Sequence, residues 1–483
     1  MLDLLKRCVV PAVASILLVT ALIVGSIWLS LFAIALLVLS AYDWFQRDYV
    51  LTRNFPVAGH FRWLFLQLRP YLRAYIVEDD LSGTPYSFEA KQLIRSRARD
   101  ESDTQPFGTE RDTDRADYHW LAHSMAPHPS PDESPRVLIG NEQTNQPFSA
   151  SLLNISAMSF GSLSAAAIEA LNIGAKLGNF YHDTGEGGLS KYHLKHGGDL
   201  VWELGSGYFG ARTAKGRFDA DSFRDKAASP AVKMIELKLS QGAKPGHGGL
   251  LPAKKVTSEI AEVRQVPEKQ DCISPRTHSE FSNPIELLEF IARLRDLSGS
   301  KPVGIKLCIG QTYEVFALMK AILLTQIYPD YIVVDGGEGG TGAAPQEFSD
   351  WIGMPLQDGL IVMRNALVGA GLKGKIRLAA SGKVYSGIGV LKNLAIGADW
   401  CNAGRAFMMS VGCVQAQRCH LGTCPTGVAT QDQWRQRGLI PDIQGERAAR
   451  FHAKTIHSLV ELTAAAGFAH PQDLMPKHFL FRT

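Results

Sequence analysis

Three closely spaced cysteines in the last fifth of the chain have the clearest chemical meaning. Cys413, Cys419 and Cys424 lie in the run Cys-Val-Gln-Ala-Gln-Arg-Cys-His-Leu-Gly-Thr-Cys, and Pro425 follows directly. Three thiols with a proline after the last are typical of an iron–sulfur cluster, whereas structural zinc sites need four ligands. His420 could be a fourth ligand, although an imidazole in that place more often orients a neighbouring ligand. The run therefore predicts an electron-carrying cluster.

Two simpler explanations of this run are weaker. Free cysteines are often buried, but a chance grouping of three is improbable in a chain with seven cysteines. A disulfide framework is less favoured still, because the remaining four are scattered: Cys8, Cys272, Cys308 and Cys401. Reduced thiols and an oxidation-sensitive cluster indicate a cytosolic compartment.

Length and charge limit the number of domains and the classes of partner that the chain can have. The chain has 483 residues, enough for one large α/β barrel or for two to three ordinary domains. Its formal net charge is only +3, so we expect no nucleic-acid partner. Many glycines lie in short clusters where the backbone turns sharply or passes close to a ligand, at 185–188, 246–249 and 336–340.

The first 45 residues predict a membrane anchor. No charged residue occurs from Cys8 to Tyr42, and a helix of this length would span about 50 Å, against about 30 Å for a bilayer core. Two short spans that turn at Gly25 and Ser26 fit better than one tilted helix or a cleaved signal peptide. Basic residues on both sides, Lys6, Arg7, Arg47, Arg53 and Arg62, indicate that both ends face the cytoplasm. We expect a cytoplasmic catalytic domain anchored in a bacterial inner membrane.

Three further regions follow this anchor. Residues 46–134 form an accessory region whose aromatic and basic stretch, 61–70, would lie on the membrane surface or pack on the catalytic domain. From residue 135 to 435, short β-rich runs alternate with helical stretches, as in parallel sheets with crossover helices. Residues 436–483 predict a helical extension.

Eight candidate strands in the central region predict a (β/α)₈ TIM barrel. The runs are Ser151–Ile155, Asn179–His182, Leu200–Leu204, Ile235–Leu239, Val303–Cys308, Tyr331–Val334, Ile376–Ala380 and Asp399–Asn402. Helical stretches between them include 164–177, 284–297 and 313–325. The expected fold class is thus α/β, a TIM barrel preceded by a transmembrane helical hairpin.

The unusual residues of this region fall at the carboxyl ends of the strands. Residues 244–249 follow the fourth strand, 336–341 the sixth, 381–383 the seventh and 404–405 the eighth. This is the catalytic face of such barrels, and the loops after strands seven and eight commonly bind phosphate. Gly382 and Gly404 would bring backbone N–H groups to a phosphate, and Lys383 or Arg405 would supply charge.

Lys306 lies within the fifth predicted strand. A lysine there must either pair with an acid inside the barrel or serve a ligand at its mouth, and we favour the ligand.

Five strings in order resemble the central FMN-binding domain of glutamate synthase. They are residues 156–162, 184–188, 241–246, 339–343 and the cysteine run through Gln431. The resemblance covers about residues 135–435. It implies a (β/α)₈ barrel that carries FMN and a [3Fe-4S] cluster and that aminates 2-oxoglutarate to glutamate through 2-iminoglutarate.

The resemblance also implies roles for individual residues. Cys413, Cys419 and Cys424 would bind the cluster. The cofactor-binding residues would be Ala157, Met158 and Ser159 along the flavin, Lys306 near its pyrimidine edge, Gly339 and Gly340, and Gly382, Gly404 and Arg405 around its phosphate. Lys244 and Arg264 would bind a substrate carboxylate. Glu186 is a candidate catalytic acid, or else a structural carboxylate.

Four positions depart from the family pattern. His247 and Leu250 replace the glutamate and glutamine of Lys-Pro-Gly-Glu-Gly-Gly-Gln, Asn283 replaces a serine, and Glu338 replaces an aspartate. A leucine leaves a polar substrate atom unpaired, which costs about 1–3 kcal/mol. The sequence therefore predicts an oxo-acid or amino-acid substrate, with 2-oxoglutarate as one candidate.

Electrons and nitrogen are expected from outside the chain. We identify no amidotransferase domain and no Gly-x-Gly-x-x-Gly unit that joins a strand to a helix. The expected partners are an external electron donor or acceptor, a ferredoxin-like protein or a membrane carrier, and an ammonia-supplying protein. Three hypotheses follow: reductive amination of an oxo acid, oxidation of an amino acid with electrons passed to a membrane carrier, and a non-catalytic electron-transfer or assembly subunit.

Overall fold

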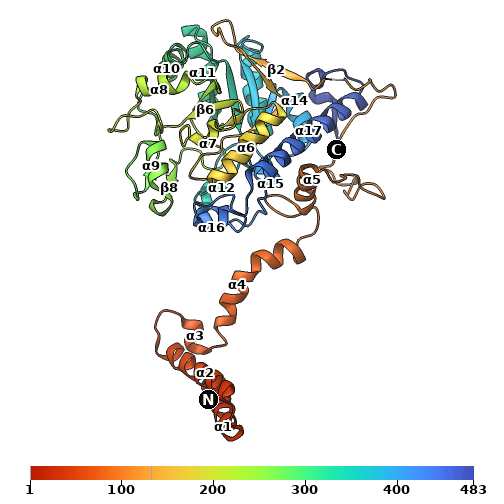
Figure 1. Cartoon of the computed structure of the whole chain (residues 1–483). Helices are drawn as coiled ribbons and strands as arrows, with labels where there is room; N and C mark the ends of the chain where they lie inside the picture. The colour runs from red at the N-terminus through yellow and green to blue at the C-terminus, as the bar shows by residue number, and fades with distance from the viewer. Residues whose placement is uncertain (1, 132, 483) are drawn as a thin grey trace. The chain divides into compact units, whose positions relative to one another are not determined.

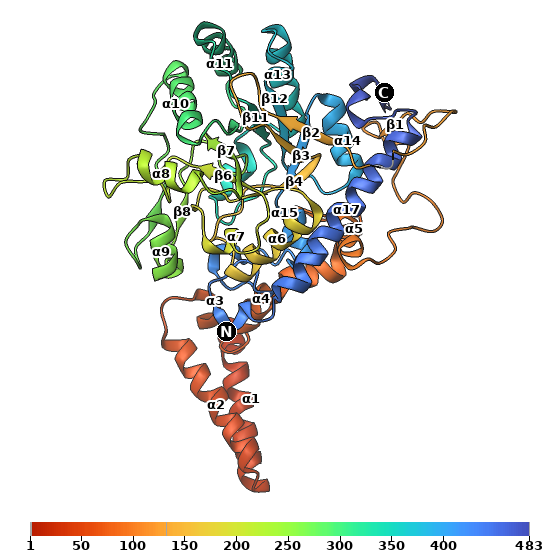
Figure 2. The same cartoon turned by 45° about the horizontal axis from the view of Figure 1, so that its top comes forward.

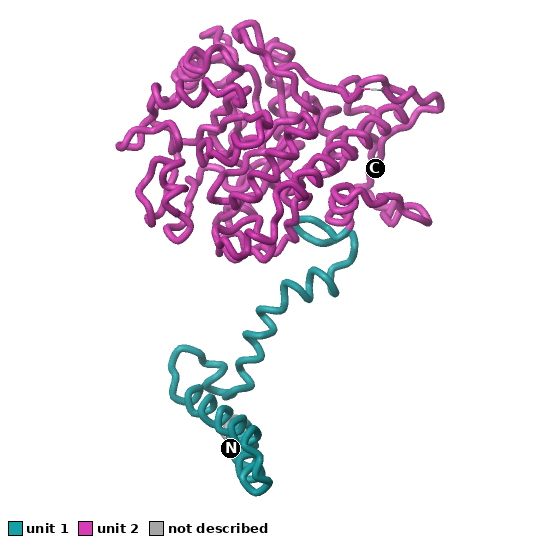
Figure 3. The backbone as a smooth tube through the Cα atoms, in the orientation of Figure 1, with its two compact units in different colours: residues 1–88 teal, residues 89–483 magenta. Residues whose placement is uncertain are grey.

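The computed structural model describes residues 2–131 and 133–482 and divides the chain into two compact units, 1–88 and 89–483 (Figure 3). The division falls inside the accessory region expected at 46–134. Helix α5 (Phe88–Arg99) contributes Ile94 and Ala98 to the core of the larger unit. Arg97 Nη1 in the same helix donates a hydrogen bond of 3.3 Å to Thr455 Oγ1. Residues from 89 onward are therefore part of the larger unit.

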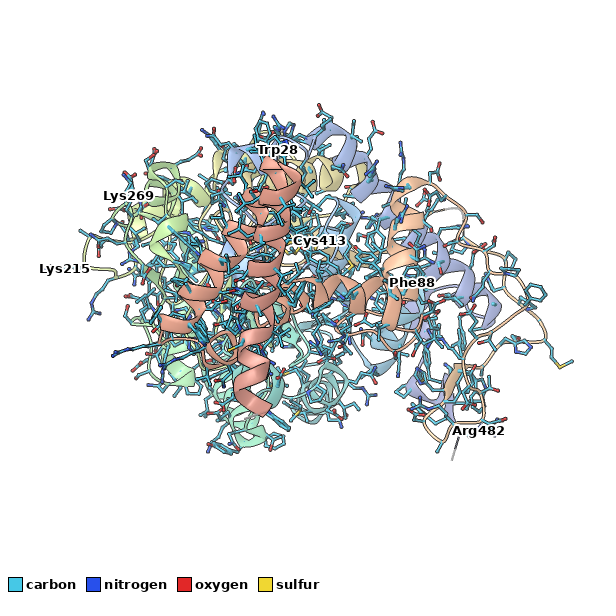
Figure 4. All side chains as sticks on the ribbon, turned by 90° about the horizontal axis from the view of Figure 1, so that it is seen from below. Trp28, Phe88, Lys215, Lys269, Cys413 and Arg482 are labelled. Atoms are coloured by element: carbon cyan, nitrogen blue, oxygen red, sulfur yellow. The ribbon has the colours of Figure 1, made fainter. Side chains whose placement is uncertain are left out.

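The smaller unit begins with a helical hairpin (Figure 1). Helices α1 (Leu2–Val24) and α2 (Ile27–Phe45) are joined at Gly25, whose φ is +71°, and Ser26 caps α2, as the sequence predicted. Among the described helices, α2 is the one long and apolar enough to cross a membrane, with a mean hydropathy of 1.8. The apolar part of α1, Cys8–Val24, is shorter. Trp28, in the first turn of α2, is 84 % exposed (Figure 4).

Two further helices complete this unit. They are α3 (Val50–Asn54) and α4 (His60–Leu72), which ends in a π-helical turn, η1 (Arg73–Val77). The first residue of α4 is held at the end of α2, because His60 Nε2 lies 2.8 Å from Asp43 Oδ1. The backbone N–H of Val57 donates to the other oxygen of Asp43 at 2.8 Å. The start of α4 therefore lies at the open end of the hairpin.

The larger unit contains a closed barrel of eight parallel strands (Figure 2). In chain order they are β4 (Leu153–Ile155), β5 (His182–Asp183), β6 (Leu200–Leu204), β7 (Val232–Lys238), β10 (Val303–Leu307), β11 (Tyr331–Asp335), β12 (Arg377–Ser381) and β13 (Trp400–Ala403). Strand β13 closes the barrel on β4, with Ala403 opposite Ile155. The predicted TIM barrel is confirmed. The second strand begins later than expected because Asn179, with a φ of +52°, caps the preceding helix.

Helices follow the strands around the outside of the barrel. They are α6 (Ala165–Gly178), α7 (Lys191–Leu194), α8 (Ala220–Ala227), α9 (Ser258–Arg264), α10 (Pro284–Leu297), α11 (Thr312–Thr325), α12 (Gln346–Trp351), α13 (Leu356–Gly369), α14 (Gly387–Ile396) and α15 (Arg405–Ser410). The hydroxyl of Ser164 accepts from the N–H of Ala167, so it caps α6. Such caps satisfy the free N–H groups of the first turn and fix where each loop ends.

Short elements outside the barrel close its ends and edges. They are the paired strands β2 (Arg136–Ile139) and β3 (Phe148–Ser151), β8 (Leu250–Leu251) and β9 (Cys272–Ile273), and β1 (His119–Leu121) and β14 (Phe479–Phe481), together with helices α16 (Gln433–Gln436) and α17 (Pro441–Ala465) and the 3₁₀ turns η2 (Ala253–Lys255), η3 (Cys419–Leu421), η4 (Pro471–Asp473) and η5 (Pro476–His478). Helix α17 lies along α6 (Figures 1 and 2), and a Cβ on Gly174 would lie 2.6 Å from Ala448 Cβ. The predicted extension thus packs on the barrel.

Aromatic side chains fill part of the barrel interior. Tyr181 donates to Asn402 Oδ1 at 2.6 Å and accepts from Trp400 Nε1 at 2.8 Å. The ring of Tyr331 lies so close to β10 that a Cβ on Gly304 would be 2.4 Å from it. β10 therefore requires glycine at position 304, opposite the ring of Tyr331. These aromatic side chains pack inside the barrel close to the first residues of β5, β11 and β13.

Candidate active site at the barrel mouth

A buried layer of charged side chains lies below the mouth. Lys306 contacts Glu203 Oε2 and lies 3.1 Å from Glu236 Oε1, and all three side chains are at most 5 % exposed. Lys238 Nζ lies 3.7 Å from Glu203 Oε1. Of the two roles considered for Lys306, the structure shows the pair inside the barrel. Any contact to a cofactor would come from an ammonium already held by carboxylates.

Burial shifts the pKa values of two acids in this layer. Burial and the neighbouring Asp183 carboxyl raise the pKa of Glu236 well above its ordinary value. Burial also raises the pKa of Asp183, although Lys306 opposes this. Burial thus favours the neutral form of Glu236, and Lys306 lies within ion-pair distance of both Glu203 and Glu236.

Two cations meet at the ends of β12 and β13. Burial and then the charge of Arg405 lower the pKa of Lys383, so the two groups lie close together. Arg405 Nη2 donates to the carbonyl of Glu338 at 2.5 Å, and its side chain passes 2.7 Å from where a Cβ on Gly340 would lie. Gly382 has a φ of +141°, which favours glycine. A pair of cations beside glycine backbone suits a phosphate, at the position that this barrel fold commonly uses.

The three cysteines lie on a loop after α15. Cys424 is buried, and Cys413 (labelled in Figure 4) and Cys419 are half-buried. Burial raises the pKa of Cys413 to about 12, and the charges of Cys419 and Cys424 act in the same direction. Burial opposes ionisation of Cys424 too, but Thr426 and nearby backbone N–H groups lower its pKa overall. Three cysteines on one loop, with hydrogen-bond donors aimed at Cys424, suit a cluster of iron and sulfide.

The cysteine loop is attached to the loop that follows β4. Gln431 Nε2 donates to the carbonyls of Gly161 and Leu163, both at 3.0 Å. The N–H of Ser164 donates to the carbonyl of Val428 at 2.9 Å. Because Ala157, Met158 and Ser159 belong to this same loop, the predicted cluster ligands lie on a segment that is bonded to the predicted flavin-lining loop.

Lys255 lies beside the cysteine loop and was missed by sequence reasoning. It is 6 % exposed, and its Nζ donates to the carbonyl of Cys419 at 2.6 Å. Burial lowers its pKa, while Cys419 and Cys424 act in the opposite direction. A buried cation next to three thiols signals an anionic group there. Its position directly after Lys254 gave no sign of this role in the sequence.

Lys244 and Arg264 lie on the other side of the mouth. Lys244 Nζ donates to the carbonyl of Ala343 at 3.0 Å, and burial lowers its pKa. Arg264 is 5 % exposed, donates to the carbonyl of Phe160 at 3.2 Å, and lies over the ring of Phe209. Its Nε has no hydrogen-bond partner within the described residues. A buried guanidinium with an unused donor suits an anionic ligand.

Glu186 lies between these cations. Its Oε2 is 3.0 Å from Lys238 Nζ, and a Cβ on Gly205 or Gly249 would lie within 2.7 Å of its oxygens. Burial favours protonation, but Lys238 followed by Arg264 and Lys244 outweighs it and lowers the pKa of Glu186 to about 2. Of the two readings of Glu186, a catalytic acid or a structural carboxylate, this lowered pKa favours a carboxylate paired with Lys238.

The four departures from the family pattern have structural explanations. Asn283 caps α10 by accepting from the N–H groups of Ile285 and Glu286, both at 3.0 Å. Glu338 accepts from the N–H of Leu356 at 2.9 Å, at the start of α13. His247 packs edge-on against Phe348. Leu250 is 48 % exposed on the β8–β9 ribbon. Asn283 and Glu338 thus stabilise helix starts.

One string matches the letters of a dinucleotide fingerprint. Gly205-Ser-Gly-Tyr-Phe-Gly210 follows β6, but the chain continues in turns, and α8 begins only at Ala220. The fingerprint requires a helix that starts at the glycines, so this segment lacks that geometry. A cavity of about 850 Å³ near Lys233 and Lys301 lies at the amino-terminal ends of the strands, away from the mouth.

Comparison with known sequences decides the family. Residues 89–469 match the profile described as the conserved region in glutamate synthase. The chain is also 34 % identical over 478 residues to a glutamate synthase large subunit-like protein of Bacillus subtilis, covering 90 % of each chain. The chain belongs to the glutamate synthase family.

The chain is also similar to a further curated relative and to two solved structures. The chain is 34 % identical over 312 residues to an archaeal-type glutamate synthase (NADPH) of Thermotoga maritima, covering 64 % of this chain and 58 % of that one. Among solved structures, a flavocytochrome b2 with pyruvate bound is 12 % identical, with a TM-score of 0.44 over 87 % of this chain and 85 % of that one. A mandelate oxidase with (S)-4-hydroxymandelic acid is 14 % identical, with a TM-score of 0.45, over 83 % and 91 %.

Proposed function

We propose that this chain is a membrane-anchored oxidoreductase of glutamate synthase type that carries FMN and a [3Fe-4S] cluster and reductively aminates a 2-oxo acid. The observation that carries the proposal is the attachment of the cysteine loop to the loop after β4, through Gln431 and Ser164. This attachment joins the candidate electron entry to the candidate flavin site. The family of the chain supports the same assignment.

The residues at the mouth fit FMN. Lys383, Arg405 and the backbone at Gly382 and Gly404 would hold its phosphate, and the loop of Met158 would line its ring. When bound, FMN exchanges single electrons with a metal centre and delivers a hydride equivalent. The buried Lys306, held by Glu203, would place a positive charge below the ring. These side chains thus supply position and charge.

The residues around Arg264 and Lys244 fit the substrate. Arg264 and Lys244 would bind its carboxylates, since Arg264 keeps one buried donor without a partner. Ammonia replaces the carbonyl oxygen of the oxo acid, which leaves as water, and the resulting imine takes up two electrons and two protons to give the amino acid. The Glu186 carboxylate would bind and orient the ammonia nitrogen or accept its proton. The electrons would come from a ferredoxin-like protein or a membrane carrier.

The anchor would be the hairpin of α1 and α2. Helix α2 has the length and hydropathy of a span, and the apolar side chains of both helices are exposed, Val13, Ile16, Leu22, Ile27 and Val38 among them. Exposed apolar surface of this extent calls for a lipid environment. The catalytic unit would face the cytoplasm of a bacterial cell.

The direct test is isotope incorporation. Purified full-length protein is incubated anaerobically with chemically reduced ferredoxin, ¹⁵N-ammonium and 2-oxoglutarate, and the Arg264→Met variant serves as the matched control. We expect ¹⁵N-glutamate from the wild type and at least about a hundredfold less from the variant, because a bidentate ionic contact is removed. Formation of no glutamate above background would refute 2-oxoglutarate as the substrate.

The reverse reaction is the second candidate. An apolar anchor would hold the enzyme next to lipid-soluble electron carriers. Amino acids added anaerobically to the oxidised protein would then bleach the flavin absorbance. Bleaching by an amino acid together with no glutamate synthesis would favour this direction.

A further inference from the structure

The segment from His60 to Val77 has no role in the proposed reaction. Within it, α4 and the η1 turn have no buried residue, and eleven large apolar or aromatic side chains are 39–74 % exposed. These are Phe61, Trp63, Leu64, Phe65, Leu66, Leu68, Tyr71, Leu72, Tyr75, Ile76 and Val77. Such a surface is unusual for a segment that only links two parts of a chain.

Three arginines follow one face of this segment. Arg62, Arg69 and Arg73 are spaced by seven and four residues, which places them on the same side of a helix. Leu64, Leu68, Tyr71 and Tyr75 fall on the opposite side by the same spacing. The segment is therefore amphipathic, with a cationic face and an aromatic and aliphatic face.

A cavity of about 690 Å³ lies on the arginine face. It is lined by the three arginines, by Phe65, Leu66, Leu72 and Val77, and by Glu78 and Ser82. Arg73 pairs with Glu78 at 2.7 Å, whereas Arg62 and Arg69 form no ion pair within the described residues. A space of this size with two unpaired guanidinium groups and apolar walls suits an amphiphilic anion.

The position of α4 identifies the source of that anion. The contact of His60 with Asp43 fixes the start of α4 at the open end of the hairpin, and the rings of Tyr49 and Trp63 meet at 5.5 Å. If the hairpin crosses a bilayer, this end lies at the boundary of lipid and water. Basic amphipathic helices at that boundary bind anionic lipids.

We propose that the arginine face of residues 60–77 is a binding site for an anionic phospholipid. Arg62 and Arg69 bind the phosphate, and Phe65, Leu66 and Leu72 contact the acyl chains. This inference rests on the membrane anchor of the proposed function and goes beyond it.

The test uses full-length protein in nanodiscs of phosphatidylcholine with one third phosphatidylglycerol. Lipid retained after detergent exchange is counted by native mass spectrometry. The variant is Arg62→Gln with Arg69→Gln, and the matched control is Arg47→Gln with Arg53→Gln, which removes the same charge outside the cavity. We expect selective retention of phosphatidylglycerol by the wild type and the control, and about 30-fold weaker retention by the variant.

Other outcomes overturn the proposal. Equal retention by the variant and the control would show attraction by overall charge alone. Binding of inorganic phosphate in detergent as tightly as the lipid would assign the cavity to free phosphate. A dimer that the variant converts to monomer, without retained lipid, would assign this face to a second copy. Failure of the wild type to enter nanodiscs would instead refute the anchor, so the two failures are distinguishable.

Discussion

The buried pair of Lys306 and Glu203 yields the most specific prediction about the barrel. Replacing Lys306 by Met keeps the length of the side chain but removes its charge. Glu203, which is 1 % exposed, would then keep only Lys238, at 3.7 Å. Glu236 would be affected less, because burial and the Asp183 carboxyl already raise its pKa. The variant thus leaves one buried carboxylate with inadequate compensation.

The expected cost follows from this geometry. Breaking a buried ion pair by removing one partner costs about 3–5 kcal/mol. At about 2 °C per kcal/mol for a large domain, the midpoint of thermal unfolding should fall by about 6–10 °C. Adding Glu203→Gln to the Lys306→Met variant should restore a large part of the loss, because residue 203 then carries no charge that lacks its partner.

Thermal unfolding is followed by tryptophan fluorescence in detergent at neutral pH. Lys301→Met is a suitable control, because Lys301 is a buried lysine that donates only to the backbone carbonyls of Ala227 and Ser229. It should cost about 1–2 kcal/mol. A Lys306→Met variant no less stable than this control would refute the buried pair, and would place the ammonium at the mouth.

Three further predictions concern the site. Arg405→Ala should weaken FMN binding about 10- to 100-fold, measured by flavin fluorescence, because a charged hydrogen-bond donor is lost; unchanged affinity would exclude Arg405 from the phosphate site. Lys255→Met should move the midpoint of cluster reduction to a more negative potential in a redox titration, since a buried positive charge next to Cys419 is removed; an unmoved midpoint would count against this. The pKa of Glu186 is lowered from 4.5 to about 2, so its contribution of up to about 3 kcal/mol is complete above about pH 4.5 and is lost as the pH falls toward 2. Unfolding free energies of the wild type and Glu186→Gln should therefore converge in acid, and a constant difference would contradict the ion pair.

Most of the fold could be predicted from the sequence, because most barrel strands are short apolar runs and several are followed by loops rich in glycine and basic residues. Pro284 marked the start of α10, and Gly25 marked the turn of the hairpin. Strand ends were less certain where a capping residue such as Asn179 belongs to the preceding helix. Local sequence patterns therefore predicted the type of each element better than its first and last residues.

The site was predictable only in part, because burial and pairing depend on distant parts of the chain. The sequence singled out Lys306 but not its partner Glu203, which lies 103 positions away on β6. Lys255 reaches the carbonyl of Cys419 across 164 positions. The protonation of Glu186 depends on Lys238, which no motif marked. Charged residues inside predicted barrel strands were the available signal for Glu203 and Lys238.

The most direct test of the central claim compares the wild type with Cys419→Ser, purified anaerobically as full-length protein. The account predicts bound FMN together with iron and sulfide in a ratio of about three to four in the wild type, and rapid bleaching of the flavin by reduced ferredoxin. The variant should keep FMN, lose the iron and bleach at least about a hundredfold more slowly. Wild-type protein without iron, or a variant that bleaches equally fast, would contradict the claim that the cysteine loop feeds electrons to the flavin.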